Sequence, residues 1–396
     1  MAANSSQRTP GGRLFSWRHV NWMHVDWHVL LLGLCLLGLG LLFVSAMDAA
    51  DRELGRDGVN FASQLRKVTV TLPFLGLALL LRPRWLRKNA SWVYGLSLVF
   101  LLLVPIFGEM RNNARRWIPL PGGFDLQPSE LAKLGVIVML ARVLYTSRLS
   151  RWSDWLRPAA VALVPMALVA LQPDLGTAMT IVPVTLGMLY VAGGSGRRIA
   201  ALVGSCVLAF TLAYQFDLIR DYQMRRVQTW VDSMAAESLI ADRNGTAFHT
   251  YHARVAIGNG GWFGRGLGRG VANEAAVLPE RDCDSIFAVI AEEAGFVGTA
   301  GLLALYALMI VLLLKSASGV RERFSRLVVT GLALYFASHF FVNIGVNLGL
   351  IPMTGLTLPL FSTGGSSMFT SFVALGLALG LAAQREAALD GDAFRE

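Results

Sequence analysis

The sequence is short of charged residues for its length. Charged side chains make up 15% of its 396 residues and hydrophobic ones 54%, whereas soluble domains carry about 25% charged residues. A large core does not account for this deficit, but runs of about 20 apolar residues do. The runs are continuous and do not alternate with polar residues, which excludes an outer-membrane barrel. The composition therefore predicts an all-α polytopic membrane protein.

Other absences narrow the class further. The three cysteines, Cys35, Cys206 and Cys283, show no metal-ligand spacing, so they indicate neither zinc nor a disulfide framework. No Gly-Lys-Ser/Thr follows the glycine-rich passage at 258–270, which excludes a P-loop. Residues 1–25 hold three arginines and no apolar core, which is typical of a cytoplasmic tail and not of a cleaved signal peptide.

Long apolar runs predict about ten transmembrane helices. One run, 286–314, is too long for a simple span, so its first turns, with Glu292 and Glu293, are expected at the membrane interface or along a cavity. Pro128 and Pro158 are expected at span starts, where a missing N–H costs little. The runs lie at 28–47, 67–82, 91–107, 130–146, 158–172, 175–192, 198–216, 286–314, 327–348 and 366–384.

The net charge of +9 fits basic cytoplasmic loops, so it does not point to nucleic acid. With the N-terminus inside, the inner connections are rich in Lys and Arg, and this asymmetry predicts that both termini are cytoplasmic. The expected parts are a cytoplasmic tail at 1–26, a transmembrane domain at 27–384 and a cytoplasmic tail at 385–396. The inner basic residues are Arg82, Arg84, Arg87, Lys88, Arg148, Arg151, Arg157, Arg197, Arg198, Lys315, Arg321, Arg323, Arg326 and Arg385.

A long polar segment, 217–285, is predicted on the outer side and departs from this charge pattern. Its arginines, together with Arg115 and Arg116, suit an anionic partner because guanidinium pairs bidentately with phosphate. The alternative is charge balance with nearby acids, although Arg115 and Arg116 have no local acidic excess. The arginines of the long segment are Arg220, Arg225, Arg226, Arg243, Arg254, Arg265, Arg269 and Arg281, and its nearby acids include Asp217, Asp221, Asp232 and Glu237.

Asp282 and Asp284 stand where this polar segment meets the next apolar run. Partial desolvation there raises a carboxyl pKa and favours a general base, whereas a helix N-terminus favours the anion and suggests a helix cap. Two residues apart, the acids do not share one helix face, so one can cap while the other reacts. Position alone does not decide between them.

Two further groups are candidates for binding. Glu130 and Lys133 are three residues apart on one predicted helix and can pair, and ionisable groups within a span are functional candidates. The alternative is an interfacial ion pair, with Trp117 in the aromatic belt. Ser366 and Ser367 follow a re-entrant segment and begin the last span, where they can cap the helix or donate to an anion.

The remaining polar features have structural interpretations. The glycine-rich passage permits positive φ and close approach of backbone to a ligand, or is a flexible connector. Trp262 and Phe263 within it favour a packed loop on the membrane surface. His249 and His252 are interpreted as surface residues because no further metal ligand accompanies them. A stripe of His339, Asn343 and Asn347 has helical spacing and predicts hydrogen bonding between helices.

Taken in order, several blocks resemble the SEDS family, which includes RodA and FtsW. The resemblance extends from the first predicted span to the last. It departs from the family pattern at Cys283, Ser285 and Thr363, where the family usually has Thr, Phe and Tyr. The blocks are Arg116-Trp117, Gln127-Pro128-Ser129-Glu130 with Lys133, Gln172-Pro173-Asp174-Leu175-Gly176-Thr177-Ala178, Ala256-Ile257-Gly258 with Gly260-Gly261 and Gly264, Leu278-Pro279-Glu280 with Asp284, and Leu358-Pro359 with Gly364-Gly365-Ser366-Ser367.

The resemblance implies a peptidoglycan glycosyltransferase of ten spans. It would polymerise lipid II, the undecaprenyl diphosphate-linked disaccharide peptide, on the outer face of the bacterial cytoplasmic (inner) membrane. Its partner would be a class B penicillin-binding protein, in cell elongation or division. The family's essential carboxylate matches Asp284, which favours it over Asp282. The family's other functional positions match Arg116, Trp117, Glu130 and Lys133.

These residues suggest a mechanism and leave two alternatives open. Asp284 is expected to act as the general base, and Arg115, Arg116 and Lys133 to hold the diphosphate, with inversion at the anomeric carbon. Ser366 and Ser367 complete the predicted binding residues. Mg²⁺ or Mn²⁺ could assist, although no complete ligand set is evident. The alternatives are a flippase for lipid-linked precursors and a non-catalytic scaffold for a penicillin-binding protein.

Overall fold

The computed structural model describes residue 15 and the ranges 20–56, 58–111, 114–120, 124–216, 221–242, 245, 247–274, 278 and 280–384. Both predicted tails lie largely or wholly outside these residues, as do Asp217, Arg220 and Arg243. Ten long helices in the described part match the ten apolar runs. They are α1 (Trp27–Glu53), α2 (Phe61–Leu79), α3 (Pro83–Phe107), α4 (Pro128–Thr146), α5 (Ser153–Leu171), α6 (Leu175–Val191), α7 (Gly196–Gln215), α12 (Ile286–Gly319), α13 (Arg323–Asn347) and α14 (Gly365–Ala383).

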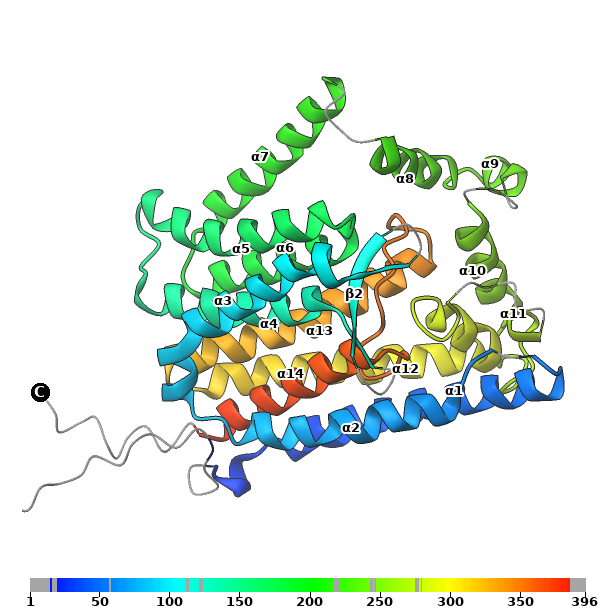
Figure 1. Ribbon diagram of the computed structural model, residues 1–396, viewed down its shortest axis with the longest axis horizontal. Helices are drawn as coiled ribbons and strands as arrows, with labels where there is room; N and C mark the ends of the chain where they lie inside the picture. The colour runs from blue at the N-terminus through cyan, green and yellow to red at the C-terminus, as the bar shows by residue number, and fades with distance from the viewer. Residues whose placement is uncertain are drawn as a thin grey trace, which may run out of the picture.

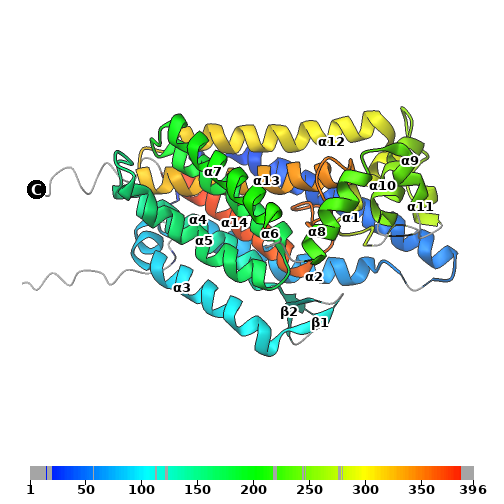
Figure 2. The same cartoon turned by 90° about the horizontal axis from the view of Figure 1, so that it is seen from above.

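The long helices form a bundle whose centre is α4, α13 and α14 (Figures 1 and 2). By length and apolar composition, six of the described helices can cross a membrane, and α6 is a shorter apolar helix. Within their most apolar stretches, α14 is 83% buried and α13 is 72% buried, whereas α3 is 22% buried. The outer helices expose apolar side chains and the centre holds polar ones, which is the distribution expected of a bundle in lipid. The prediction of an all-α polytopic membrane protein is confirmed.

Glycine determines how closely α14 packs against α2. A Cβ added to Gly376 would lie 2.2 Å from the carbonyl oxygen of Leu75, and one added to Gly380 would lie 2.2 Å from that of Leu79. Without a hydrophobic driving force between helices in lipid, such small residues let backbones approach and gain packing. The spacing of four residues places both glycines on the same face of α14.

The predicted inner connections gather at one end of the bundle. Arg323 donates to the carbonyl oxygens of Ser147 and Ala192, at 2.8 and 3.0 Å, and so joins three connections. Gln384, just after α14, donates to Leu81 beside the start of α3. The predicted outer connections meet at the opposite end (Figure 1). The alternation that the charge pattern required is therefore present, while the direction of the bundle in the membrane remains a prediction.

Four short helices lie in the described part of the long polar segment, where the sequence indicated only a loop. They are α8 (Asp221–Asp232), α9 (Ala236–Ala241), α10 (Phe248–Asn259) and α11 (Val271–Glu274). In Figure 1, α7 and α8 project from the bundle, and α10 returns toward the start of α12. Of these helices, α10 and α11 pack on the predicted outer end of the bundle, against α1, α12 and α13.

The glycine-rich passage packs against a break in α12. This helix is interrupted at Gly295, whose φ is 67°, so the prediction that the run exceeds one simple span is confirmed. The amides of Phe296 and Val297 donate to carbonyl oxygens of the passage, and a Cβ on Gly264 would lie 2.1 Å from the Glu293 oxygen. The expected close backbone approach is thus to α12 itself.

The structure differs from the sequence predictions in two local features. Pro158 lies inside α5, which begins at Ser153, so the prediction that it starts a helix is wrong, whereas Pro128 does stand in the first turn of α4. A small antiparallel sheet between α3 and α4 was not predicted. Its strands are β1 (Glu109–Arg111), β2 (Ala114–Leu120) and β3 (Phe124–Leu126), in the order β1-β2-β3.

Candidate active site

Asp284 lies at the junction of the long segment and α12, immediately before the cap residue Ser285. Its side chain is 10% exposed. The side-chain amides of Asn343 and Asn347 both donate to its backbone carbonyl oxygen, at 3.0 and 2.9 Å. The carboxylate is thus presented by a backbone that two α13 residues hold in place, while a small part of it remains accessible. Such positioning suits a catalytic carboxylate.

A histidine that the sequence indicated as a surface residue approaches this carboxylate. The His249 Nε2 atom of α10 is 3.9 Å from Asp284 Oδ1 and 2.7 Å from Ser285 Oγ. The Ser285 hydroxyl in turn lies 3.4 Å from Asp284 Oδ1. The interpretation of His249 as a surface residue is therefore wrong. Thirty-six residues separate it from Ser285, so only the folding of α10 brings them together.

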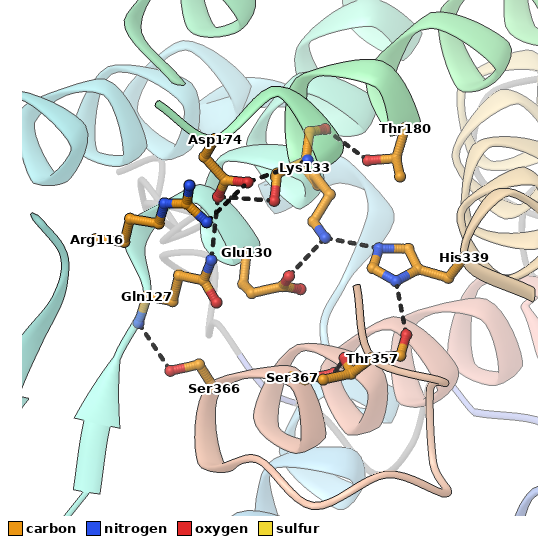
Figure 3. A network of polar contacts seen from close by, with 11 residues as sticks. Arg116, Gln127, Glu130, Lys133, Asp174, Thr180, His339, Thr357, Ser366 and Ser367 are labelled. Carbon is orange, nitrogen blue, oxygen red and sulfur yellow. Dashed lines mark hydrogen bonds and ion pairs between the residues drawn. The ribbon is translucent and has the colours of Figure 1, made fainter. Parts of the chain in front are cut away.

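The polar stripe of α13 connects Asp284 to a second charged cluster. Figure 3 shows that cluster, which His339 joins. Besides Asp284, the Asn343 amide binds the Leu356 carbonyl oxygen at 2.7 Å. One turn earlier, His339 Nε2 lies 2.6 Å from Lys133 Nζ, and its Nδ1 lies 3.3 Å from the Thr357 carbonyl oxygen. The prediction of hydrogen bonding between helices is confirmed for His339, which contacts Lys133 of α4. Asn343 and Asn347 instead bind carbonyl oxygens that lie outside the helices. The stripe joins α4, α13, the segment before α14 and the start of α12.

Lys133 and Glu130 form the predicted pair in the interior of the bundle. Their Nζ and Oε1 atoms are 2.7 Å apart, and each side chain is 4% exposed. Because the ammonium group donates, His339 Nε2 is the acceptor, which places the imidazole proton on Nδ1 toward Thr357. Lys133 Nζ also lies 5.4 Å from the centre of the Tyr335 ring. The Lys133 ammonium is therefore in contact with Glu130, His339 and Tyr335, and the pair is buried in the protein.

Arg116 binds the turn between α5 and α6. Its guanidinium donates to the carbonyl oxygens of Gln172 and Pro173 and lies 3.7 Å from Asp174 Oδ1. Asp174 caps α6 and accepts a bond from Gln127 Nε2 at 3.2 Å (Figure 3). The guanidinium thereby ties the small sheet to the bundle.

The other predicted binding residues are arranged around this network. Arg115 is exposed and donates to the Pro105 carbonyl oxygen, and Trp117 is half-buried on the same strand. Ser366 accepts a bond from the Gln127 amide at 2.8 Å. Ser367 Oγ lies 2.6 Å from Thr357 Oγ1. Neither serine caps α14, so that alternative is wrong; both instead hold neighbouring segments against the helix start.

Asp282 faces a different partner from Asp284. Its carboxylate accepts a bond from the Thr363 hydroxyl, and its carbonyl oxygen accepts one from the Thr363 amide at 2.8 Å. Asp282 therefore ties its loop to the segment before α14 and does not cap α12. It also lines a cavity of about 300 Å³ together with Lys67, Glu280, Arg281 and other residues of α2 and its preceding loop.

Glu280, Asp282 and Cys283 form the one group of metal-ligating types found among the described residues, with candidate ligand atoms within 4.8 Å of one another. Burial raises the pKa of the Cys283 thiol well above its usual range, and the charge of Asp282 adds to this. Partial burial, followed by the charges of Asp284 and Asp282, raises the pKa of Glu280. The two carboxylates suit Mg²⁺ or Mn²⁺, whereas a protonated thiol does not.

Several outer arginines are bound to the chain itself. Arg281 forms a buried ion pair with Asp51 of α1, with the side chains 8% and 2% exposed. Arg254 donates to the carbonyl oxygens of Ser233, Leu348 and Gly349. For Arg281 the charge-balance alternative is therefore correct, although its partner is Asp51 and not an acid of the long segment.

Comparison with known proteins agrees with this architecture. The model of the FtsW/RodA/SpoVE family of cell cycle proteins matches residues 26–387. The chain is 34% identical to the peptidoglycan glycosyltransferase MrdB of Escherichia coli K12, over 84% of this chain and 88% of that one. It is 35% identical to the probable peptidoglycan glycosyltransferase FtsW of Halomonas elongata, over 74% of each.

Two solved structures extend the agreement to three dimensions. A chain of a peptidoglycan synthase complex, in which polymerization and crosslinking are coordinated, superposes with a TM-score of 0.77 at 32% identity, covering 92% of this chain and 99% of that one. The rod shape determining protein RodA of Thermus thermophilus superposes with a TM-score of 0.68 at 32% identity and the same coverage. The chain belongs to the FtsW/RodA/SpoVE family.

Proposed function

We propose that the protein is a peptidoglycan glycosyltransferase that polymerises lipid II on the outer face of the bacterial cytoplasmic membrane. The observation that supports this most directly is Asp284, a carboxylate fixed at the junction of a folded outer segment and a spanning helix in a chain of this family. MrdB and FtsW, relatives of similar length, are named for the same activity. The multi-pass fold is consistent with a substrate anchored by a lipid.

The proposed reaction joins an acceptor sugar hydroxyl to the anomeric carbon of a donor. The hydroxyl oxygen forms the new C–O bond while the bond from that carbon to undecaprenyl diphosphate breaks, and the diphosphate leaves with the electron pair. Asp284 accepts the hydroxyl proton as the attack proceeds. A single displacement of this kind inverts the anomeric centre, which converts an α-linked donor into a β-linked glycan.

His249 and Ser285 support Asp284 in this proposal. If His249 Nε2 carries the proton, it donates to Ser285 Oγ at 2.7 Å, and the serine hydroxyl donates to Asp284 Oδ1 at 3.4 Å. The serine hydroxyl thereby orients the carboxylate, and the histidine orients the serine. The arrangement depends on a hydroxyl at position 285. A phenylalanine there, which the SEDS resemblance gives as usual, has no such group.

Cationic residues at the outer end would stabilise the leaving diphosphate. Arg115 is exposed and donates to the Pro105 carbonyl oxygen, and a guanidinium with five N–H donors can also bind phosphate. Arg116 is held by Asp174, and Lys133 is held by Glu130. In the proposal, these two cations contribute positive electrostatic potential near the diphosphate, and their acidic partners fix their positions. Trp117, Ser366 and Ser367 remain proposed binding residues beside them.

A divalent cation is an additional part of the proposal. Bound Mg²⁺ or Mn²⁺ would neutralise negative charge on the diphosphate. Glu280 and Asp282 are the residues that would hold it, because their carboxylates are close together and border the cavity of about 300 Å³. A chelator should then reduce polymerisation, and added Mg²⁺ or Mn²⁺ should restore it.

The test uses the full-length purified protein with labelled lipid II. Polymer should form, its new linkages should be β, and a cognate class B penicillin-binding protein should increase the yield. Lipid II translocation in vesicles without any glycan product, with or without that partner, would instead identify a flippase. Complex formation without polymer or translocation would identify a scaffold.

A further inference from the structure

A second charged site lies at the opposite end of the bundle. A cavity of about 480 Å³ opens between the start of α3 and the end of α4. Four cationic side chains and two hydroxyl groups line it, and none of its described lining residues is acidic. They are Arg84, Arg87, Lys88, Arg142, Tyr145 and Thr146. Guanidinium, ammonium and hydroxyl donors around one concave space match the acceptor oxygens of a phosphate group.

The cavity is built by contacts between helices. Arg142 of α4 donates to the backbone carbonyl oxygens of Arg87 and Lys88, at 3.1 and 2.8 Å. Arg87 pairs with Glu322 at 3.0 Å and lies 5.0 Å from the centre of the Tyr145 ring. Glu322 is the acid that Arg87 brings to the cluster. The described residues that line the cavity supply cations and hydroxyl groups and no carboxylate, so the lining itself is positively charged.

The helix start adds to this positive charge. Arg84, Arg87 and Lys88 all lie in the first six residues of α3, whose first turn has no acidic residue. Cations at a helix N-terminus are unfavourable, because that end carries the positive pole of the helix dipole. A bound anion would offset this repulsion. The excess of Lys and Arg in cytoplasmic loops accounts for basic residues at this end of the bundle, but it does not require that they converge on one cavity. Arg148 and Arg321, for example, lie outside the cavity.

The outward face of α3 continues from the cavity as an apolar stripe. Lys88 is followed at helical spacing by Trp92, Leu96 and Val99, whose exposed fractions are 77%, 57% and 49%. Residues three and four apart share one face of a helix, so a cationic end and an apolar stripe lie in line. This profile matches a phospholipid, with a charged headgroup and acyl chains, better than a free anion.

We propose that this cavity binds the phosphate of an anionic phospholipid headgroup, with the acyl chains lying along α3. Arg84 and Lys88 contact the phosphate, and Arg142 maintains the backbone on which they stand. The site is distinct from the one that contains Asp284, and the proposal does not depend on the glycosyltransferase activity. Its effect is to anchor the inner end of α3 and α4 to the headgroup layer.

The test measures lipid retained by the full-length protein. The protein in neutral detergent is mixed with equal amounts of phosphatidylglycerol and phosphatidylcholine, and bound lipid is counted by native mass spectrometry. We expect preferential retention of phosphatidylglycerol. Arg84→Gln with Lys88→Gln should weaken that retention on the order of tenfold or more, since each basic residue near a surface contributes to anionic lipid binding. Retention of phosphatidylcholine should not change.

A matched control removes the same charge from the same side. Arg148→Gln with Arg321→Gln alters two exposed residues outside the cavity and should leave the preference intact. If both double variants lose the preference for phosphatidylglycerol equally, general surface charge explains the binding and the proposed site is wrong. Equal retention of the two lipids by the unaltered protein would also overturn the proposal. Lys88→Gln alone changes one exposed side chain and should give a partial loss if the double variant does not fold.

A further arm separates a lipid headgroup from a small anion. Inorganic phosphate is added at constant ionic strength while phosphatidylglycerol is bound. The proposal expects little displacement, because the acyl chains contribute contacts along α3 that phosphate lacks. Full displacement by millimolar phosphate would show that the cavity binds a free anion and would overturn the proposal of a lipid headgroup.

Discussion

The two ends of the helix bundle hold the same kinds of cationic side chain in opposite electrostatic settings. At the predicted outer end, Lys133 is paired with Glu130 and Arg281 with Asp51. At the predicted inner end, Arg84, Lys88 and their neighbours line one cavity with few acids. Paired cations in the interior fix geometry, whereas cations that converge on an open cavity present N–H donors to an anion that enters it. Charge counts along the chain do not separate these roles, but the surroundings of each side chain do.

The comparison has a counterpart at the outer end, where two aspartates two residues apart differ in their partners. Asp282 is bonded to Thr363, and Asp284 lies beside His249 and Ser285 with its carbonyl oxygen held by α13. One therefore fastens a loop, and the other is the proposed base. Substituting each aspartate in turn tests whether partners distinguish function here as well.

Asp284→Asn should produce the largest effect. The amide keeps the size of the side chain but does not accept the hydroxyl proton, so polymerisation of lipid II should fall by about 10²-fold to 10⁴-fold, the usual contribution of a general base. Asp282→Asn is the matched control. With Mg²⁺ or Mn²⁺ in excess, which offsets weaker cation binding, it should lose much less activity, because an amide oxygen still accepts the Thr363 bond. Full polymerisation by the Asp284 variant would remove it from the mechanism.

Breaking the buried ion pair should have the next largest effect. Lys133→Met leaves Glu130 as a buried charge without its partner, which should lower the free energy of unfolding by about 3–5 kcal/mol. The double change to Glu130→Leu with Lys133→Met should recover much of that loss, since it removes both charges. Thermal unfolding in detergent measures both. Equal destabilisation by the single and double changes would contradict the pairing argument.

His249→Ala should have an intermediate effect on catalysis. Removing one hydrogen bond near a charged group should lower kcat for lipid II polymerisation about tenfold. Ser285→Ala should give a similar loss, and the double variant should lose little more, because both residues act through the same bond. His252→Ala, on the same helix, is the control and should retain activity. Additive losses from the two changes would show that His249 and Ser285 act independently.

The sequence predicted the parts of this molecule that depend on local composition. Ten apolar runs became ten long helices, because a run long enough to cross lipid must satisfy its backbone within itself. Glu130 and Lys133 were predicted as a pair because three-residue spacing on a helix places side chains together. The stripe that begins at His339 followed from the same periodicity. These predictions needed no knowledge of distant contacts.

Long-range contacts set the limit of that reasoning. His249 and Ser285 lie far apart in the sequence, and nothing local indicates that α10 packs at the start of α12. The sheet between α3 and α4 has two strands of only three residues, which leave no alternating pattern to detect. The choice of Asp284 over Asp282 came from the family resemblance, and the different partners of the two acids became visible only in the fold.

The smallest predicted effect concerns Glu280, which precedes Asp282 and Asp284 by two and four residues in the sequence. Its raised pKa means that the folded state favours the protonated form. The associated stability is therefore fully present below the unfolded pKa of a glutamate and is lost as pH rises through the higher folded pKa. Glu280→Gln removes this loss, so the variant should gain slightly in thermal stability over the unaltered protein at neutral pH and not in acid. Because Glu280 is substantially exposed, solvent screening keeps the difference small. A gain that is independent of pH would show that packing, and not the carboxyl charge, is responsible.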